Sequence, residues 1–211
     1  MPRTKILHEV DIAHNGQFNT VTGIESAPFT VAVTVEGVVP LLMNGWDIAA
    51  VEAKSKAKKN SAEKKTDNPE SMVYRTQDGY LCITADIVHA CLVKAAKSKS
   101  DPRSPRKSAA DLIKAVLLIE PNEIPFLPKT KEWNYLDRRR VRVQMAAITR
   151  TRPAMHAGWK VRFKVTALET SYIDSVFIHD LITSAGKFCG FCDHRPQYGR
   201  FQIIDFKEVN N

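Results

Sequence analysis

The segment Trp159–Leu168 constrains the fold more than any other part of this 211-residue chain. Its apolar residues occupy every second position, and Lys160, Arg162 and Lys164 lie between them. A period of two is typical of a β-strand with one apolar face and one basic face. Because the apolar face has to be covered by other elements, we predict a sheet with one packed face and one open face.

A second alternating segment, Arg140–Ile148, is the predicted partner of this strand. Residues 149–158 would then form a long loop between two antiparallel strands. Like charges gathered on one face of a hairpin repel one another, and a bound polyanion would relieve that repulsion. Alternatively, acidic residues from other strands would neutralise the positive charge of this face. The basic residues on this open face would be Arg140, Arg142, Lys160, Arg162 and Lys164.

The order of the predicted elements indicates the fold. Periodicity and helix caps predict a strand at 29–36, helices at 84–97 and 174–187, and a strand at 200–209. A small hairpin around Asp78-Gly79 and a helix at 108–118 lie outside this core. The core order of strand, helix, strand, strand, helix, strand predicts an α+β, ferredoxin-like (RRM-like) fold, a four-stranded antiparallel sheet with helices on one face. We predict a single domain, 1–211, with two large basic insertions at about 37–83 and 98–138.

The positive charge is concentrated along the chain. There are 31 Lys and Arg against 23 Asp and Glu, a net charge of +8, and residues 54–65 and 94–107 each hold six basic residues and one acid. The Lys, Ser, Asn and Pro content around these clusters predicts mobile loops at 54–70 and 98–107. Either loop alone could equally be a solvated surface feature. Together with an open basic sheet face, the two loops favour a single-stranded nucleic acid as partner.

The most distinctive segment, residues 186–201, joins the last predicted helix to the last predicted strand. It contains three glycines together with Arg195 and Arg200. Glycine lets a backbone approach a phosphate closely, and arginine pairs with phosphate through two parallel donors. Ordinary turn chemistry is the other explanation for glycines between a helix and a strand.

This segment, in the pattern G-x-x-x-G-x-x-x-x-R-x-x-x-G-R-F, resembles the glycine-rich loop of the RAMP superfamily, which includes CRISPR-associated backbone subunits. The sequences GVVPLLMNGW at 37–46 and DHRPQYGRF at 193–201 are also similar to short phage and prophage proteins. The resemblance implies a protein that assembles as a homo-oligomer or filament along single-stranded RNA or DNA. It also implies other effector-complex subunits as partners.

Phosphate contacts are the expected mode of binding, because the open sheet face lacks the aromatic pair that an RNA-recognition motif uses to stack bases. The function we predict is a non-catalytic binder of single-stranded nucleic acid, with RNA favoured. An RNA-cleaving RAMP-type ribonuclease, or a phage protein that assembles with or decoys other subunits, are the alternatives. The candidate nucleic-acid-binding residues are Lys54, Lys56, Lys58, Lys59, Arg103, Arg106, Lys107, Arg138, Arg139, Arg140, Arg142, Lys160, Arg162, Lys164, Arg195 and Arg200.

No catalytic residue, cofactor or metal site is predicted. Some RAMP backbone subunits cut RNA with a loop aspartate, which makes Asp47 a candidate by resemblance, but a helix cap is the interpretation we prefer. His156 could act as an acid or base from a basic loop. Cys189 and Cys192 have the spacing of half a zinc site, but the sequence offers no obvious second pair of ligands.

A cytoplasmic protein without a membrane partner is expected. No apolar run approaches the ~20 residues that span a bilayer. The first residues, MPRTK, lead into no signal-peptide core. Four cysteines in such a chain are expected to be reduced thiols.

Overall fold

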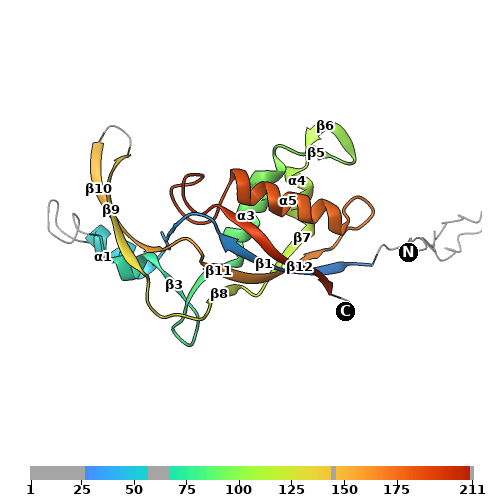
Figure 1. The fold of residues 1–211 in the computed structure, drawn as a ribbon. Coiled ribbons are helices and arrows are strands. Elements are labelled where there is room, and N and C mark those ends of the chain that lie inside the picture. Colours follow the sequence, from blue (N-terminus) through green and yellow to red (C-terminus); the bar gives the residue numbers. More distant parts are fainter. Residues whose placement is uncertain (1–26, 57–66, 144–145, 210–211) are drawn as a thin grey trace, which may run out of the picture.

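The structure is a computed structural model that describes residues 27–56, 67–143 and 146–209. Its main element within these residues is an antiparallel sheet in which four strands form the ferredoxin-like core (Figure 1). Both long helices cover the same face of this sheet, so the predicted α+β fold class is confirmed. In chain order the core elements are β1 (Phe29–Gly37), α3 (Ala85–Ala96), β7 (Leu117–Glu120), β11 (Lys160–Ala167), α5 (Ser175–Phe188) and β12 (Phe201–Val209), and the strands lie side by side as β12-β1-β11-β7.

The alternation in β11 produces the two faces that the sequence predicts. Val161, Phe163 and Val165 are fully or almost fully buried, whereas Arg162 and Lys164 are exposed. On the packed side, α5 begins where its cap predicts, because Asp174 Oδ1 accepts a hydrogen bond from the N–H of Phe177 (2.7 Å). Packing of α3 and α5 against the valines of β1 and β11 forms the hydrophobic core.

The predicted pairing of Arg140–Ile148 with β11 is wrong. That segment lies in β9 (Tyr135–Val143) and β10 (Ala146–Met155), which pair with each other and, through β10, with β2 (Leu41–Leu42) in a separate three-stranded sheet. Residues 149–158 were predicted to be a loop, but most of them belong to β10. A two-residue connection between β9 and β10 costs less chain entropy than a ten-residue loop, which favours the local hairpin.

The vacant edge of β11 is occupied by β7 and β8 (Glu123–Leu127), which lie end to end along it. The helix predicted at 108–118 is shorter, α4 (Ala110–Val116), and the residues after it form β7. Beyond β8, the sheet continues with β4 (Leu81–Thr84) and β3 (Tyr74–Arg75), which form the predicted small hairpin.

The two segments predicted as mobile basic loops contain regular structure. Residues 98–107 hold a two-stranded hairpin, β5 (Ser100–Asp101) and β6 (Ser104–Ser108), in which buried Asp101 pairs with Arg103 at 2.7 Å. Of the other segment, Lys54 and Lys56 belong to α1 (Ile48–Lys56), and residues 57–66 lie outside the described residues.

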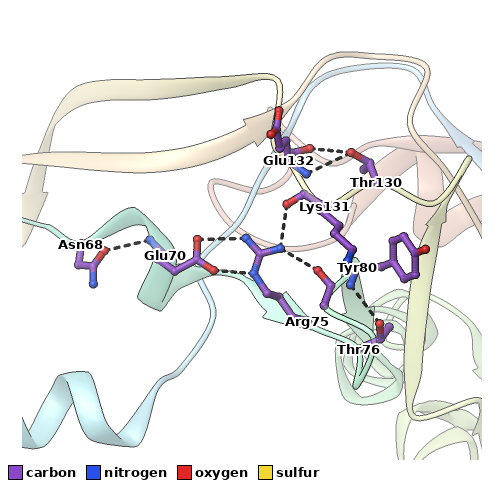
Figure 2. Close-up of polar contacts among 9 residues, drawn as sticks. Asn68, Glu70, Arg75, Thr76, Tyr80, Thr130, Lys131 and Glu132 are labelled. Carbon is purple, nitrogen blue, oxygen red and sulfur yellow. Dashed lines mark hydrogen bonds and ion pairs between the residues drawn. The ribbon is translucent and has the colours of Figure 1, made fainter.

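Arg75 joins two segments of the first insertion to one segment of the second (Figure 2). Its guanidinium contacts both carboxylate oxygens of Glu70, at 2.5 and 3.0 Å, in the short helix η1 (Pro69–Met72). The remaining donor, Nη1, bonds to the carbonyl oxygens of Gly79 (2.9 Å) and Lys131 (2.8 Å). The network therefore holds η1, the β3–β4 turn and the chain before β9 together. Within the described ranges, no helix is both long and apolar enough to cross a membrane.

Candidate nucleic-acid interface

The two distinctive sequence segments, 37–46 and 193–201, lie against each other although more than a hundred residues separate them. They are joined by hydrogen bonds between their backbones. Through this contact, the glycine-rich segment lies beside the residues that follow β1. The hydrogen bonds run from Val38 N to Arg200 O (3.0 Å), from Asp193 N to Leu42 O (3.0 Å) and from Gly199 N to Pro40 O (2.9 Å).

The glycines of this segment serve close packing within the protein. Gly199 has a φ of +74°, and a Cβ atom on it would lie 2.0 Å from Phe191 O. A Cβ on Gly186 would lie 2.2 Å from Phe201 O, so α5 could not approach β12 as closely. The N–H of Phe191 donates to Gly199 O (2.9 Å). The positive φ of Gly199 and the close backbone approaches support a role of these glycines in the turn and in packing.

The β9–β10 hairpin has one face that is anchored to the rest of the protein. Arg139 forms an ion pair with Asp137 and donates from Nη2 to the hydroxyl of Tyr198 (2.7 Å). The half-buried Arg152 forms an ion pair with Asp193 of the 193–201 segment. The hydrogen bond from the Arg139 guanidinium holds the pKa of Asp137 below its usual value, which favours the charged form of the carboxylate. Arg139 therefore acts as an anchor of the hairpin and not as a free cation.

The opposite face of the hairpin carries an arginine ladder, which we define as Arg138, Arg140 and Arg142 of β9. All three side chains are exposed, and among the described residues none of them takes part in an ion pair. Alternate residues of a strand lie about 6.6 Å apart on one face. The ladder is therefore a regular row of unneutralised positive charge. Figure 1 shows that β9, which carries the ladder, stands at one end of the molecule, away from β12 of the main sheet.

The basic residues on the open face of β11 have different surroundings. Lys160 Nζ lies 3.3 Å from Glu36, and Lys164 is paired in register with Glu120 of β7. Arg162 donates from Nε to Thr34 Oγ1 (3.0 Å). An acidic residue of a neighbouring strand thus offsets the charge of Lys160, as the alternative to a bound polyanion expects, while the polar partner of Arg162 is a neutral hydroxyl. The predicted face joining Arg140 and Arg142 to β11 does not exist, because the two sets lie on separate sheets.

The other predicted binding residues are dispersed. Arg103, Arg106 and Lys107 lie on the β5–β6 hairpin, where Arg103 is engaged by Asp101. Lys56 lies 3.8 Å from Glu52 in α1. The side chain of Lys54 and the whole of Lys58 and Lys59 are outside the described part of the structure. Arg195 and Arg200 are exposed, and each borders a hollow of its own.

The catalytic candidates have structural roles. Asp47 Oδ1 accepts hydrogen bonds from the N–H groups of Ala49 (2.9 Å) and Ala50 (3.4 Å), which makes it the N-cap of α1. His156 stacks on Tyr135, with ring centroids 4.8 Å apart.

The cysteines are free thiols. A hydrogen bond with Cys91 lowers the pKa of Cys189 to about 7, and the charges of Lys94 and Arg195 act in the same direction. Burial raises the pKa of the Cys192 thiol to about 12. In the ranges that the structure describes, no group of three or more His, Cys, Asp and Glu side chains is placed to hold a metal ion.

The anchoring residues Asp137, Arg152, Asp193 and Tyr198 were not identified from the sequence as a group. The signal available was the period of two in β9, which separates Asp137 and Arg139 from the ladder arginines. Their partners in the 193–201 segment carry no such signal, because the contact spans dozens of residues.

No protein-family model and no curated protein matches this chain. Among solved structures, it is similar to a chain of the cryo-EM structure of the Type III-B Cmr-beta bound to cognate target RNA. The TM-score is 0.51 at 8% sequence identity, over 87% of this chain and 61% of that chain. This chain therefore spans about three fifths of the length of the chain that it matches. At this identity the likeness concerns the fold.

Proposed function

We propose that this protein is a non-catalytic, oligomerising binder of single-stranded nucleic acid, with RNA as the favoured ligand. The observation that carries the proposal is the arginine ladder on the exposed face of β9. We also propose that the chain forms a single domain with insertions at about 37–83 and 98–138.

The ladder is suited to a sugar-phosphate backbone. Its spacing of about 6.6 Å is comparable to the distance between successive phosphates of an extended single strand. Each guanidinium presents paired donors that match a phosphate in shape. The neighbouring exposed residue on this face, Leu136, has no ring on which a base could stack. We therefore expect phosphate contacts with little preference for sequence.

RNA rather than DNA is supported by the likeness in fold to a chain of a complex solved with target RNA. The oligomeric part of the proposal rests on the resemblance of the glycine-rich segment to RAMP backbone subunits. Sedimentation of the protein with single strands of two lengths tests it. The number of bound copies should rise with strand length.

The ladder itself is tested by the salt dependence of binding to a labelled single-stranded RNA. Replacing Arg138, Arg140 and Arg142 by glutamine should weaken binding and reduce the slope of log K against log salt by about 2, because each phosphate contact on a single strand contributes about 0.7. The matched control replaces Lys160, Arg162 and Lys164 by glutamine and removes the same charge from the main sheet. A control that loses as much affinity as the ladder variant would contradict the assignment, and absence of binding by the unaltered protein at low salt would contradict the function.

A further inference from the structure

A cavity of about 410 Å³ opens where the two distinctive segments meet β4 and α3. Its volume lies within the range of pockets that hold small molecules, about 300–1,000 Å³. The first segment contributes Met43 and Asn44, the second contributes Asp193 and Arg195, and Cys192 precedes the second. The segments singled out by the sequence thus line one site together.

The floor of the cavity is apolar. Met43 and Cys82 are almost fully buried beneath it, with 3% and 2% of their surface exposed. Ile87 and Ala90, on one face of α3, continue this lining. A floor of methyl, methylene and sulfur groups favours a flat aromatic ring, which gains from burial and from contact with sulfur.

The rim of the cavity is polar, and some of its groups are already engaged. Asp193 pairs with Arg152, and the Tyr74 hydroxyl accepts a hydrogen bond from Trp46 N (3.1 Å). Arg195 and Asp86, by contrast, take part in no ion pair with another described residue. They give the rim one positive and one negative group with donors or acceptors to offer.

Lys94 lies one turn beyond Ala90 on α3, outside the residues that line the cavity. The cavity therefore has an apolar floor, a cationic side at Arg195 and an acceptor at Asp86. This combination matches a nucleotide, which has a flat ring, an anionic phosphate and, in three of the four common bases, an exocyclic amino group.

We propose that this cavity binds one nucleoside monophosphate unit, with the base over Met43 and Ile87, the phosphate on Arg195 and the amino group of the base toward Asp86. The inference deepens the proposed function and rests on it, since the unit would be a nucleotide of the bound strand. A free mononucleotide offers the same chemistry. The ion pair between Arg152 and Asp193 links the wall of the cavity to the hairpin that carries the arginine ladder.

The test measures binding of the four 5′-mononucleotides, of inorganic phosphate and of a single-stranded RNA by calorimetry at low salt. Ala90→Phe fills the cavity from an exposed position on α3, and Ala90→Ser is the matched control. Arg195→Gln should weaken mononucleotide binding about tenfold or more, because it removes a charged hydrogen bond. Uridine monophosphate, whose base has no exocyclic amino group, should bind least tightly. Asp86→Asn should reduce the difference in affinity between uridine monophosphate and the other three mononucleotides.

These measurements distinguish a nucleotide of the bound strand from a free mononucleotide as the ligand of the cavity. If free mononucleotides bind and Ala90→Phe abolishes their binding, the cavity takes free nucleotides. If Ala90→Phe weakens only RNA binding, the cavity takes a nucleotide of the strand. If Ala90→Phe and Arg195→Gln leave both unchanged, the inference is wrong. The ladder variant should lose RNA affinity but keep any mononucleotide binding, so that failure of the ladder and failure of the cavity give different results.

Discussion

At the scale of single residues, glycines with similar backbone conformations have different importance. Gly79 and Gly199 have φ values of +79° and +74°, so both adopt the left-handed region. A Cβ on Gly79 would meet nothing within 4 Å, whereas a Cβ on Gly199 would collide with Phe191 O. Comparing the same substitution at the two sites therefore separates the effect of close backbone packing from the effect of the left-handed conformation.

We expect Gly79→Ala to lower the free energy of unfolding by about 1–2 kcal/mol, the cost of a left-handed residue with a side chain. Gly199→Ala should cost more than about 3 kcal/mol, because the backbone of the 193–201 segment must also move. Urea denaturation of both variants measures the two values. Equal losses would show that the contact between Gly199 and Phe191 is not needed for stability.

At the scale of elements, polar contacts help to hold the β9–β10 hairpin in place. Among the residues that the structure describes, the hairpin pairs with two residues of β2 and with no strand of the main sheet. Arg139 lies against Tyr198, with its guanidinium carbon 4.6 Å from the ring centroid, and also donates to the hydroxyl. Residues of the 193–201 segment therefore help to set the direction in which the arginine ladder points, together with Asp67, which contacts Arg150 and the backbone of Thr151.

Tyr198→Phe should keep the ring under Arg139 and remove only the acceptor. We expect a loss of about 1 kcal/mol in stability, the net value of one hydrogen bond, and faster amide hydrogen exchange in 135–155. The matched control is Tyr172→Phe, an exposed tyrosine on another part of the surface, which should change little. Unchanged exchange in the hairpin of the Tyr198 variant would contradict the anchoring role.

At the scale of the whole molecule, the positive charge is divided among surfaces that do not join. The strand that carries the arginine ladder, β9, stands at one end, the β5–β6 hairpin lies on another side (Figure 1), and on the open face of β11 Lys160 is paired with Glu36. The proposed binding of a strand therefore relies on the hairpin end and not on one continuous basic surface.

The whole protein should leave RNA intact with or without magnesium, because the one aspartate that resembles a catalytic residue is committed to capping α1. Gel analysis of labelled RNA after prolonged incubation measures this. Asn caps a helix about as well as Asp, so Asp47→Asn preserves α1 and removes any carboxylate chemistry. Cleavage that disappears in Asp47→Asn would overturn the non-catalytic assignment.

Sequence reasoning predicted the elements whose signals are local. Alternation placed β1 and β11, and periodicity with the Asp174 cap placed α5, all to within a residue or two. The element order then indicated the ferredoxin-like fold even though β7, and not Arg140–Ile148, is the second core strand. The candidate site was less predictable. Its two segments were recognised, but their contact and the cavity beside them involve partners far apart in the chain.

The sequence by itself determined the elements with a clear periodicity, such as β1, β11 and α5, and which side of these strands is apolar, because both depend on the spacing of neighbouring residues. Only the tertiary structure decided which strands pair, since every alternating strand offers the same backbone donors and acceptors and the choice depends on loop closure and packing. It also decided which arginines are free. Arg139 and Arg140 are adjacent in sequence, yet Arg139 is held by Asp137 and Tyr198 while Arg140 faces solvent. A charge becomes available for binding only where the fold brings no opposite charge beside it.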